Sequence, residues 1–339
     1  MNSIIAQLDD VHLIYHEPRG ETEAVGGISL SVHKGEFVSI VGPSGCGKTS
    51  LLSIFAGILQ PSSGKAEVLG APPDPRANST GYMLQRDHLF DWRTIEQNAL
   101  LGLEVKKRLN AETHAYAAEL LDRYGLGAFK DYYPRQLSGG MKQKAALIRT
   151  LAFSPELLLL DEPFAAIDAK VRQELRSWLK EMISKLGVTS IFVTHDQDEA
   201  IEVADEIIIT NRGHIEQMGT PIEIYRHPQT AFTASFFGQT SVLADYQKYH
   251  TFQRMDGVEK AIVRPEFLKI TRKNEVQKYG SSASKGVVER TSFRGDWIEL
   301  AVRVHGDLLI AKRDLEEEPI TVGETVDVFL YPLFVIPGE

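Results

Sequence analysis

Residues suited to phosphate chemistry form one continuous run, Gly42-Pro43-Ser44-Gly45-Cys46-Gly47-Lys48-Thr49, which Ser50 follows. Glycines let backbone N–H groups converge on phosphate oxygens, and the start of a following helix adds partial positive charge. Lys48 reaches the β- and γ-phosphates, and the Thr49 hydroxyl is a ligand for Mg²⁺. We therefore predict a P-loop that binds ATP and Mg²⁺ through these residues. An accidental glycine-rich turn is disfavoured, because a predicted strand precedes the run and a predicted helix follows it.

A pair of acids supplies the second half of such a site. Asp161 and Glu162 follow the apolar run 157–160, which reads as a buried strand. We expect Asp161 to hold Mg²⁺ and Glu162 to accept a proton from the water that attacks the γ-phosphate. The alternative is a solvated acidic turn that caps the next helix. A P-loop in the same chain makes the catalytic interpretation the stronger one.

The elements that must position these groups are visible as apolar patterns. Runs at 36–41, 157–160 and 190–194 are uninterrupted, as in strands of a parallel sheet covered on both faces. Leu51, Phe55 and Ile58 recur at helical spacing after the P-loop. Residues 85–155 are rich in Ala, Leu, Glu and Lys and predict a helical insertion. The fold class is therefore α/β, a P-loop NTPase domain with a helical insertion.

The composition of the chain changes near Gly238. Short β-branched runs at 261–263, 286–288, 298–302 and 325–330 are separated by glycine and charged turns. This spacing predicts a small all-β domain, a barrel or sandwich. We expect an ATPase domain over 1–237 and a β-domain over 238–339.

Composition limits the classes of function. The 339 residues contain one cysteine, which excludes an internal disulfide, and carry a formal charge of −9, which argues against a nucleic-acid partner. No apolar run is long enough for a membrane span, and the N-terminus lacks the pattern of a signal peptide. We expect the chain to stay in the cytoplasm.

Further motifs carry a resemblance to a known family. Leu137-Ser138-Gly139-Gly140 resembles the signature motif of ABC ATPases. Gln85 resembles the family's Q-loop glutamine, residues 165–168 (Ala165-Ala166-Ile167-Asp168) its D-loop, and His195 its switch histidine. Tyr15 is similar to the aromatic residue that stacks on adenine, although a lone aromatic is equally compatible with core packing.

This resemblance implies a shared active site. Ser138, Gly139 and Gly140 would contact the γ-phosphate held by the P-loop of a second copy, so that two head-to-tail chains enclose two ATP molecules. Asp168 would lie at the same ATP site, Gln85 would contribute to catalysis and to the metal, and His195 would sense the γ-phosphate. The physical basis is a helix that begins at Ser138, with exposed N–H groups available to an anion. Met141 stands where the family most often has glutamine.

The resemblance also implies a transporter. With no membrane segment expected, the chain looks like the motor of a prokaryotic importer, peripheral on the inner face of the cell membrane. Its partners would be a second motor subunit, separate permease subunits and, indirectly, an extracytoplasmic solute-binding protein. Residues 213–221 with Pro228 resemble sugar, polyamine, iron and sulfate or molybdate importers, and the last hundred residues resemble their TOBE domain, of which Val263-Arg264-Pro265-Glu266 and Gly295-Asp296-Trp297 are part.

A different segment suggests another cargo. Residues 89–94 and 100–104, together with Asn98, look like nitrate, sulfonate and taurine importers, and this type of small solute is the cargo expectation. Phe90 and Trp92 would suit docking of a permease helix, or would pack in the helical insertion. For Trp297, core packing and a ligand platform stay open.

Two other classes of function use some of the same motifs. A soluble ABC protein acting on ribosomes or DNA usually has two motor cassettes or a long coiled-coil insertion, and neither pattern is present. A small-molecule kinase would account for the P-loop, but gives no reason for Gln85, His195 or the signature motif.

Overall fold

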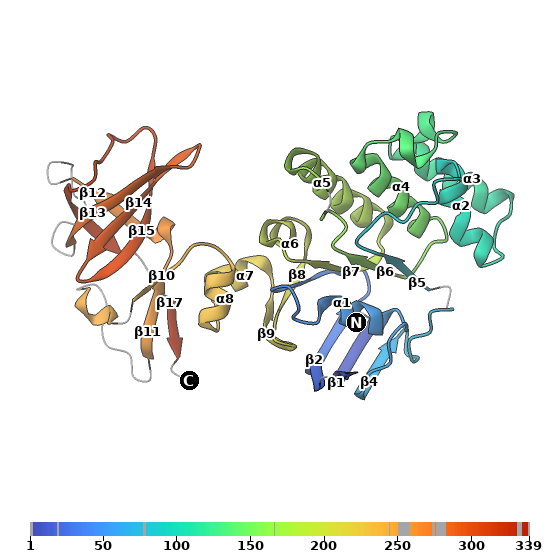
Figure 1. Cartoon of the computed structure of the whole chain (residues 1–339), viewed down its shortest axis with the longest axis horizontal. Helices are drawn as coiled ribbons and strands as arrows, with labels where there is room; N and C mark the ends of the chain where they lie inside the picture. The colour runs from blue at the N-terminus through green and yellow to red at the C-terminus, as the bar shows by residue number, and fades with distance from the viewer. Residues whose placement is uncertain are drawn as a thin grey trace. The chain divides into compact units, whose positions relative to one another are not determined.

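A computed structural model describes residues 3–18, 20–76, 79–165, 167–243, 245–249, 258–272, 275, 283–330 and 334–337. The chain forms two compact units, Met1–Pro221 and Ile222–Glu339, and each is described by itself (Figure 1). This division lies before the predicted boundary at 237/238, so residues 222–237 belong to the second unit.

The first unit is built around a six-stranded sheet. Its strands are parallel except for the last, which is antiparallel to its neighbour. Every residue of the three central strands β6, β7 and β3 is buried, which confirms the prediction of a parallel sheet covered on both faces. The order is β5 (Thr80–Met83), β6 (Leu157–Asp161), β7 (Thr189–Thr194), β3 (Phe37–Val41), β8 (Glu206–Asn211) and β9 (His214–Gly219).

A smaller antiparallel sheet carries the long N-terminal hairpin. Its order is β2 (Gly20–His33), β1 (Ile4–Glu17) and β4 (Ser63–Val68). Helix α1 (Lys48–Phe55) follows the P-loop, and its buried Leu51 and Phe55 share one core with residues of both sheets. The helix that begins at the P-loop is thereby fixed on two sides.

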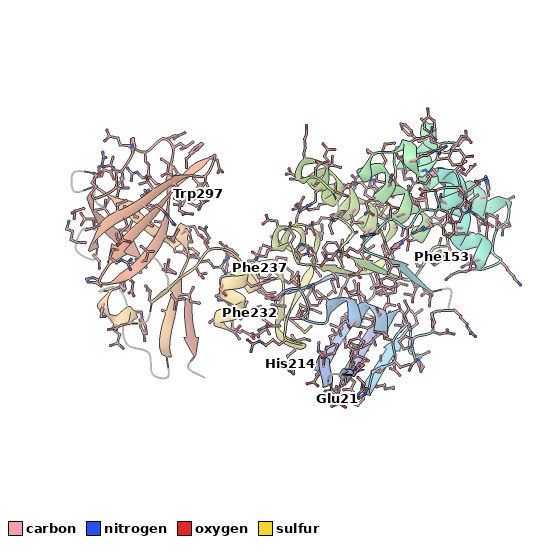
Figure 2. All side chains as sticks on the ribbon, in the orientation of Figure 1. Glu21, Phe153, His214, Phe232, Phe237 and Trp297 are labelled. Atoms are coloured by element: carbon pink, nitrogen blue, oxygen red, sulfur yellow. The ribbon has the colours of Figure 1, made fainter. Side chains whose placement is uncertain are left out.

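The predicted helical insertion is confirmed, because residues 85–155 are all described and contain no strand. It comprises α2 (Ile95–Val105), α3 (Ala111–Arg123), the short 3-10 helices η1 (Gly127–Phe129) and η2 (Pro134–Gln136), and α4 (Gly139–Leu151). Thr94 and Asn110 begin α2 and α3 with capping boxes. Phe153 follows α4 and packs with Leu103 and Ala117, which joins the three long helices (Figure 2).

Two further helices cover the sheet beside the insertion. Asp168 is the N-cap of helix α5 (Ala169–Leu186) and accepts a hydrogen bond from the N–H of Val171. Asp196 is the N-cap of α6 (Gln197–Val203) and accepts from two backbone N–H groups of that helix. Among the described residues, no helix combines the length and apolarity needed to cross a bilayer.

The second unit begins within the short helix α7 (Pro221–Arg226), whose first residue belongs to the first unit. It continues with α8 (Ala231–Phe236) and two antiparallel sheets. All four predicted strand runs fall within strands. One sheet has the order β10 (Ser241–Leu243), β11 (Val258–Val263) and β17 (Phe334–Pro337). The other has the order β12 (Leu268–Thr271), β16 (Thr325–Leu330), β13 (Ser284–Phe293), β14 (Trp297–Val304) and β15 (Asp307–Asp314), with 3-10 turns at Tyr246–Lys248 and Pro265–Phe267.

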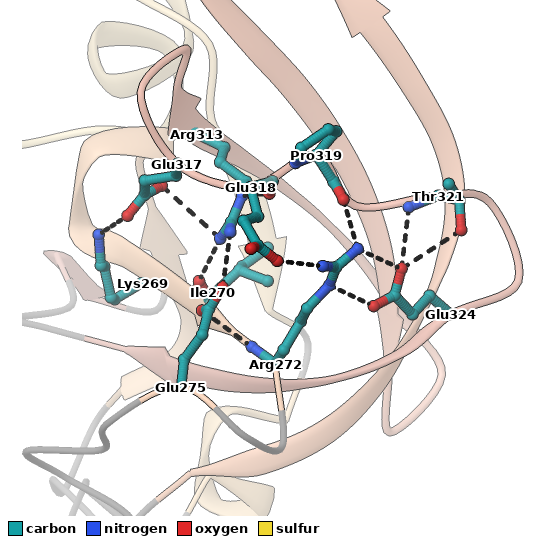
Figure 3. Close-up of polar contacts among 10 residues, drawn as sticks. All are labelled: Lys269, Ile270, Arg272, Glu275, Arg313, Glu317, Glu318, Pro319, Thr321 and Glu324. Atoms are coloured by element: carbon teal, nitrogen blue, oxygen red, sulfur yellow. Dashed lines mark hydrogen bonds and ion pairs between the residues drawn. The ribbon is translucent and has the colours of Figure 1, made fainter.

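A buried arginine joins the two edges of the larger sheet. Strands β12 and β15 are its edge strands, yet they contact each other, so the sheet curls toward a barrel. Arg313 on β15 is 2% exposed and donates to the carbonyl oxygen of Ile270 on β12 at 3.1 Å. It also donates to the carbonyl of Glu318 and the carboxylate of Glu275, both at 2.8 Å (Figure 3). Arg313 therefore closes the seam with hydrogen bonds.

Candidate active site

Most of the predicted P-loop residues and both acids line a single cavity of about 460 Å³ in the first unit. The cavity collects groups from β1, the P-loop, the start of α1, the loop that follows β5 and the end of β6. It brings together ten of the predicted residues: Tyr15, Ser44, Gly45, Gly47, Lys48, Thr49, Ser50, Gln85, Asp161 and Glu162. Thr22 and Ala24 on β2 also line it and were not predicted. They reach it because β2 pairs with β1 in the N-terminal hairpin.

The P-loop glycines allow a close approach of two backbones. Gly47 has φ of 92°, and a Cβ atom there would lie 2.2 Å from the carbonyl oxygen of Ala24. The loop therefore accepts only glycine at this position, the N-cap of α1. The Lys48 ammonium group donates to the carbonyl oxygens of Gly42 and Pro43 at 2.8 and 2.9 Å, which holds its charge against the loop.

Three predicted loop residues do not line the cavity: Gly42 and Cys46, which are buried, and Pro43, which is exposed. The Cys46 side chain is 3% exposed, and its Sγ lies 3.2 Å from the hydroxyl of Thr210 on β8. The thiol thus packs against the sheet, as expected for a small residue chosen for its size.

The donor set for Mg²⁺ is made of oxygen atoms. The Thr49 hydroxyl donates to Oδ1 of Asp161 at 3.1 Å, so the two predicted ligands already lie side by side. Burial raises the pKa of Asp161, and hydrogen bonds from Thr49 and Tyr82 act against that rise. Hydroxyl, carboxylate and amide oxygens are the ligands Mg²⁺ prefers, so Thr49, Asp161 and Gln85 fit the ion.

Tyr82 on β5 is a site residue that sequence reasoning missed. Burial, followed by the charge of Asp161, raises the pKa of Tyr82 to about 12. The phenol therefore stays protonated at neutral pH and can donate to the Asp161 carboxylate. Its position in the strand that leads to Gln85 is the only signal in the sequence.

Glu162 is fixed between the two other predicted catalytic residues. Its Oε1 lies 3.1 Å from Nδ1 of His195, and its Oε2 accepts a hydrogen bond from Nε2 of Gln85 at 3.1 Å. The Glu162 backbone has φ of 42°, a left-handed conformation that is uncommon for a residue other than glycine. The structure therefore brings the predicted base, sensor and Q-loop glutamine together at the carboxyl ends of β5, β6 and β7.

The signature residues and Asp168 do not line this cavity. Ser138 is exposed and caps α4, with its hydroxyl accepting from the N–H of Met141 at 3.4 Å. Gly140 is buried, and a Cβ atom there would lie 2.6 Å from Val171, so this glycine lets α4 approach α5. Asp168 and Gly139 are exposed, whereas Ala166 of the predicted D-loop lies outside the described residues.

Tyr15 lies at the rim of the cavity. Its hydroxyl is 3.1 Å from Oγ of Ser50, and the residue is 38% exposed, so it is not part of the core. The exposed ring is available to a planar ligand. A role in stacking on adenine stays a prediction.

Comparison with known proteins identifies both units. The profile of the family described as "ABC transporter" matches residues 25–165, and that described as "TOBE domain" matches residues 261–332. The sulfate/thiosulfate import ATP-binding protein CysA of Gloeobacter violaceus is 42% identical over 279 residues, covering 81% of this chain and 79% of the relative. The protein of the same name from Synechocystis sp. is 40% identical over 294 residues, covering 84% and 81%.

Solved structures agree with this assignment. The structure of cbiO1 from Clostridium perfringens, part of the ABC transporter complex cbiONQ, has a TM-score of 0.60 and 30% identity, covering 67% of this chain and 92% of its own. A dimeric post-hydrolysis state of the ATP-binding cassette MJ0796, bound to ADP and Pi, has a TM-score of 0.57 and 30% identity, covering 64% and 99%. The chain therefore belongs to the ABC transporter family, as an ATP-binding ATPase subunit with a C-terminal TOBE domain.

Proposed function

We propose that this chain is the ATP-hydrolysing motor of an importer and works as a head-to-tail homodimer that encloses two ATP molecules. The observation that carries the proposal is a divided site. P-loop and acids share one cavity, whereas Ser138 and Gly139 are exposed and do not line it. A second copy is the partner that brings an exposed helix start to the γ-phosphate. The dimeric cassette bound to ADP and Pi supports this arrangement.

The chemistry follows from the residues around Glu162. A water oxygen attacks the γ-phosphorus while Glu162 takes one of its protons, and the bond from phosphorus to the β-phosphate oxygen breaks, releasing ADP and phosphate. Lys48 and the exposed start of α4 at Ser138 and Gly139 in the opposing copy stabilise the phosphoryl charge, and His195 orients the γ-phosphate. When bound at Thr49, Asp161 and Gln85, Mg²⁺ supplies positive charge to the phosphate oxygens.

We infer that the cargo is an oxyanion of the sulfate and thiosulfate class. The relatives reported above are named for sulfate/thiosulfate import, and the same assignment agrees with the resemblance of residues 213–221. These relatives do not support the cargo expected from residues 89–104, which was nitrate, sulfonate or taurine. Uptake of labelled sulfate by cells that lack this chain tests the point. Wild type is expected to restore uptake and Glu162→Gln not to, and restored nitrate or taurine uptake alone would reject the assignment.

We also propose that residues 90–94 dock the permease at the inner face of the membrane. Trp92 is 72% exposed and its ring stacks on Phe90, with centroids 4.7 Å apart, so it does not pack in the core of the insertion. Buried Asn98 holds this loop by accepting from the N–H of Phe90 and donating to its carbonyl. An exposed Trp92 ring held against partly buried Phe90 is a suitable anchor for a short helix of a partner.

The test of the motor is ATP-dependent dimerisation of Glu162→Gln, measured by light scattering of the full chain. We expect ATP to bind, hydrolysis to fall by about 10² to 10⁴, and a stable dimer to form. Ser138→Arg in the same variant is expected to abolish the dimer while leaving ATP binding intact. A Glu162→Gln chain that hydrolyses ATP normally would reject Glu162 as the base. A dimer that survives Ser138→Arg would reject the head-to-tail arrangement.

A further inference from the structure

A charged contact joins the segment before α5 to the segment that carries His195. Arg172 lies in the first turn of α5, four residues after Asp168. Its Nη2 donates to the carbonyl oxygen of Ile167 at 2.9 Å, and its Nη1 donates to Oδ2 of Asp196 at 3.3 Å. One guanidinium group therefore contacts residue 167 on one side and the neighbour of His195 on the other.

The receiving segment is tightly bonded. Oδ1 of Asp196 accepts from the N–H groups of Asp198 and Glu199 at 3.0 and 3.2 Å, which starts α6. The N–H of Asp196 donates to the Thr194 hydroxyl at 3.0 Å, and that hydroxyl donates to buried Glu199 at 2.5 Å. Any movement of Asp196 would therefore also move Thr194 and Glu199. His195 lies in the chain between Thr194 and Asp196, so it would move with them.

The contact is protected from solvent. The side chains of Arg172 and Asp196 are 27% and 23% exposed, so the pair is screened less than an ordinary surface ion pair. Arg172 also lies 3.9 Å from the Glu199 carboxylate, which adds a second negative partner on α6. A planar guanidinium group can bond a carbonyl and a carboxylate at once, which an ammonium group matches poorly.

We propose that Arg172 is a positioning residue that couples the D-loop segment, residues 165–168, to His195. The inference rests on the proposed function, in which Asp168 lies at the shared ATP site and His195 orients the γ-phosphate. Closure of the dimer on residues 165–168 is then transmitted through Ile167, Arg172 and Asp196 to the imidazole. The partners of Arg172 are Ile167, Asp196 and Glu199, and none of them lines the cavity, so Arg172 acts through its neighbours.

The next turn of the helix supplies a matched control. Arg176 forms an ion pair of the same kind: its Nη1 donates to Oε2 of Glu202 on α6 at 3.3 Å. It also joins α5 to α6, but its ion-pair partner is Glu202 rather than Ile167 or Asp196. Arg176→Gln therefore removes a similar ion pair without touching the proposed link.

The experiment is a double-mutant cycle in the full chain. We expect Arg172→Gln to lower kcat by about tenfold to thirtyfold, as for loss of a charged hydrogen bond, with the Kd for ATP changed less than about twofold. Arg176→Gln is expected to lower kcat less than about threefold. In a His195→Ala background, Arg172→Gln is expected to cost nothing further, because its effect passes through the imidazole.

Each outcome separates the inference from the proposed function. The link is overturned if the losses of kcat from Arg172→Gln and His195→Ala multiply in the double variant. It is also overturned if Arg172→Gln and Arg176→Gln lower kcat equally. Both outcomes leave His195 in its role. A His195→Ala chain with normal turnover rejects the role of His195 itself, and the link with it. Asp196→Asn provides a second variant if Arg172→Gln folds poorly, since asparagine keeps the helix cap but weakens the bond to Arg172. It is expected to lower kcat in the same, His195-dependent way.

Discussion

The imidazole Nδ1 of His195 lies 3.1 Å from Oε1 of Glu162, so the side chains that follow two neighbouring parallel strands, β7 and β6, are in contact. Gln85 occupies the other oxygen of that carboxylate from the end of β5. The orientation of Glu162 is therefore set from both sides, and the left-handed backbone of this residue fixes where its side chain starts. The proposed base is therefore held in place and would lose little entropy when the attacking water arrives.

Replacing Gln85 tests this orientation. We expect Gln85→Ala to lower kcat by about tenfold, because one hydrogen bond to a charged group is lost, while the Kd for ATP changes little. Gln85→Glu should lower kcat further, because it places a second negative charge beside Glu162. Steady-state ATPase assays and fluorescent-nucleotide binding measure the two quantities. Turnover of Gln85→Glu equal to that of wild type would contradict the proposed contact.

Asn98 is expected to control the stability of the exposed aromatic loop. It is fully buried and bonds four backbone groups, including the carbonyls of Arg93 and Thr94. Asn98→Ala leaves buried polar groups without partners and should cost about 2 to 4 kcal/mol of unfolding free energy.

The same substitution should open the loop locally. Tryptic cleavage after Arg93 is expected to accelerate in Asn98→Ala, since the loop then opens more often. Asn110→Ala is the control: it removes an exposed helix cap, costs about 1 kcal/mol and should leave cleavage after Arg93 unchanged. Equal cleavage rates in wild type and Asn98→Ala would show that Asn98 does not hold the loop.

Arg313 is expected to be essential to the seam of the β-domain. Its three bonds join β15 to Ile270, Glu318 and Glu275, and the residue is almost fully buried. Arg313→Ala leaves a carboxylate and two carbonyls without this donor and should destabilise the second unit by about 3 to 5 kcal/mol. Calorimetry of the full chain measures the change. Arg272→Ala, which removes a more exposed arginine of the same network, should cost less, and the reverse order would contradict the assignment (Figure 3).

Glu324 should make the stability of the same unit depend on pH. The hydrogen bond from Arg272 lowers the pKa of Glu324 below its usual value. A lowered folded-state pKa means that the stabilisation is present above the unfolded pKa, near 4.5, and is lost as the pH falls through the folded value.

The melting temperature of Glu324→Gln should therefore lie below that of wild type at pH 7, and the difference should shrink as the pH falls well below 4.5. Thermal unfolding of the full chain at several pH values follows this difference. Glu316→Gln, an exposed residue of the neighbouring turn, is the control and should not change it. A difference for Glu324→Gln that does not depend on pH would contradict the role of the carboxylate.

Much of the site could be predicted because most of its residues belong to short motifs that are continuous in the sequence. The P-loop, the acids after β6 and the glutamine after β5 each lie where a parallel strand ends, so the sheet brings them together. The strands were predictable for a related reason, since burial on both faces leaves uninterrupted apolar runs.

The remaining site residues depend on tertiary pairing. Thr22 and Ala24 reach the cavity through the β1–β2 hairpin, and Tyr82 contacts Asp161 across two paired strands. No local pattern distinguishes Arg172, whose partner Asp196 is 24 residues away. The division of the chain into units also differs from the predicted boundary, because a change of composition marks where strands begin rather than where contacts are fewest.

The buried position of Cys46 has a practical consequence. The sequence contains no other cysteine, and this thiol faces Thr210 beneath the P-loop, where a bulky reagent would reach it slowly. The wild-type chain is therefore close to a thiol-free background for spectroscopy. Single cysteines introduced on exposed helix positions can carry spin labels or fluorophores with little competing signal, and distances between two copies can be followed through a catalytic cycle.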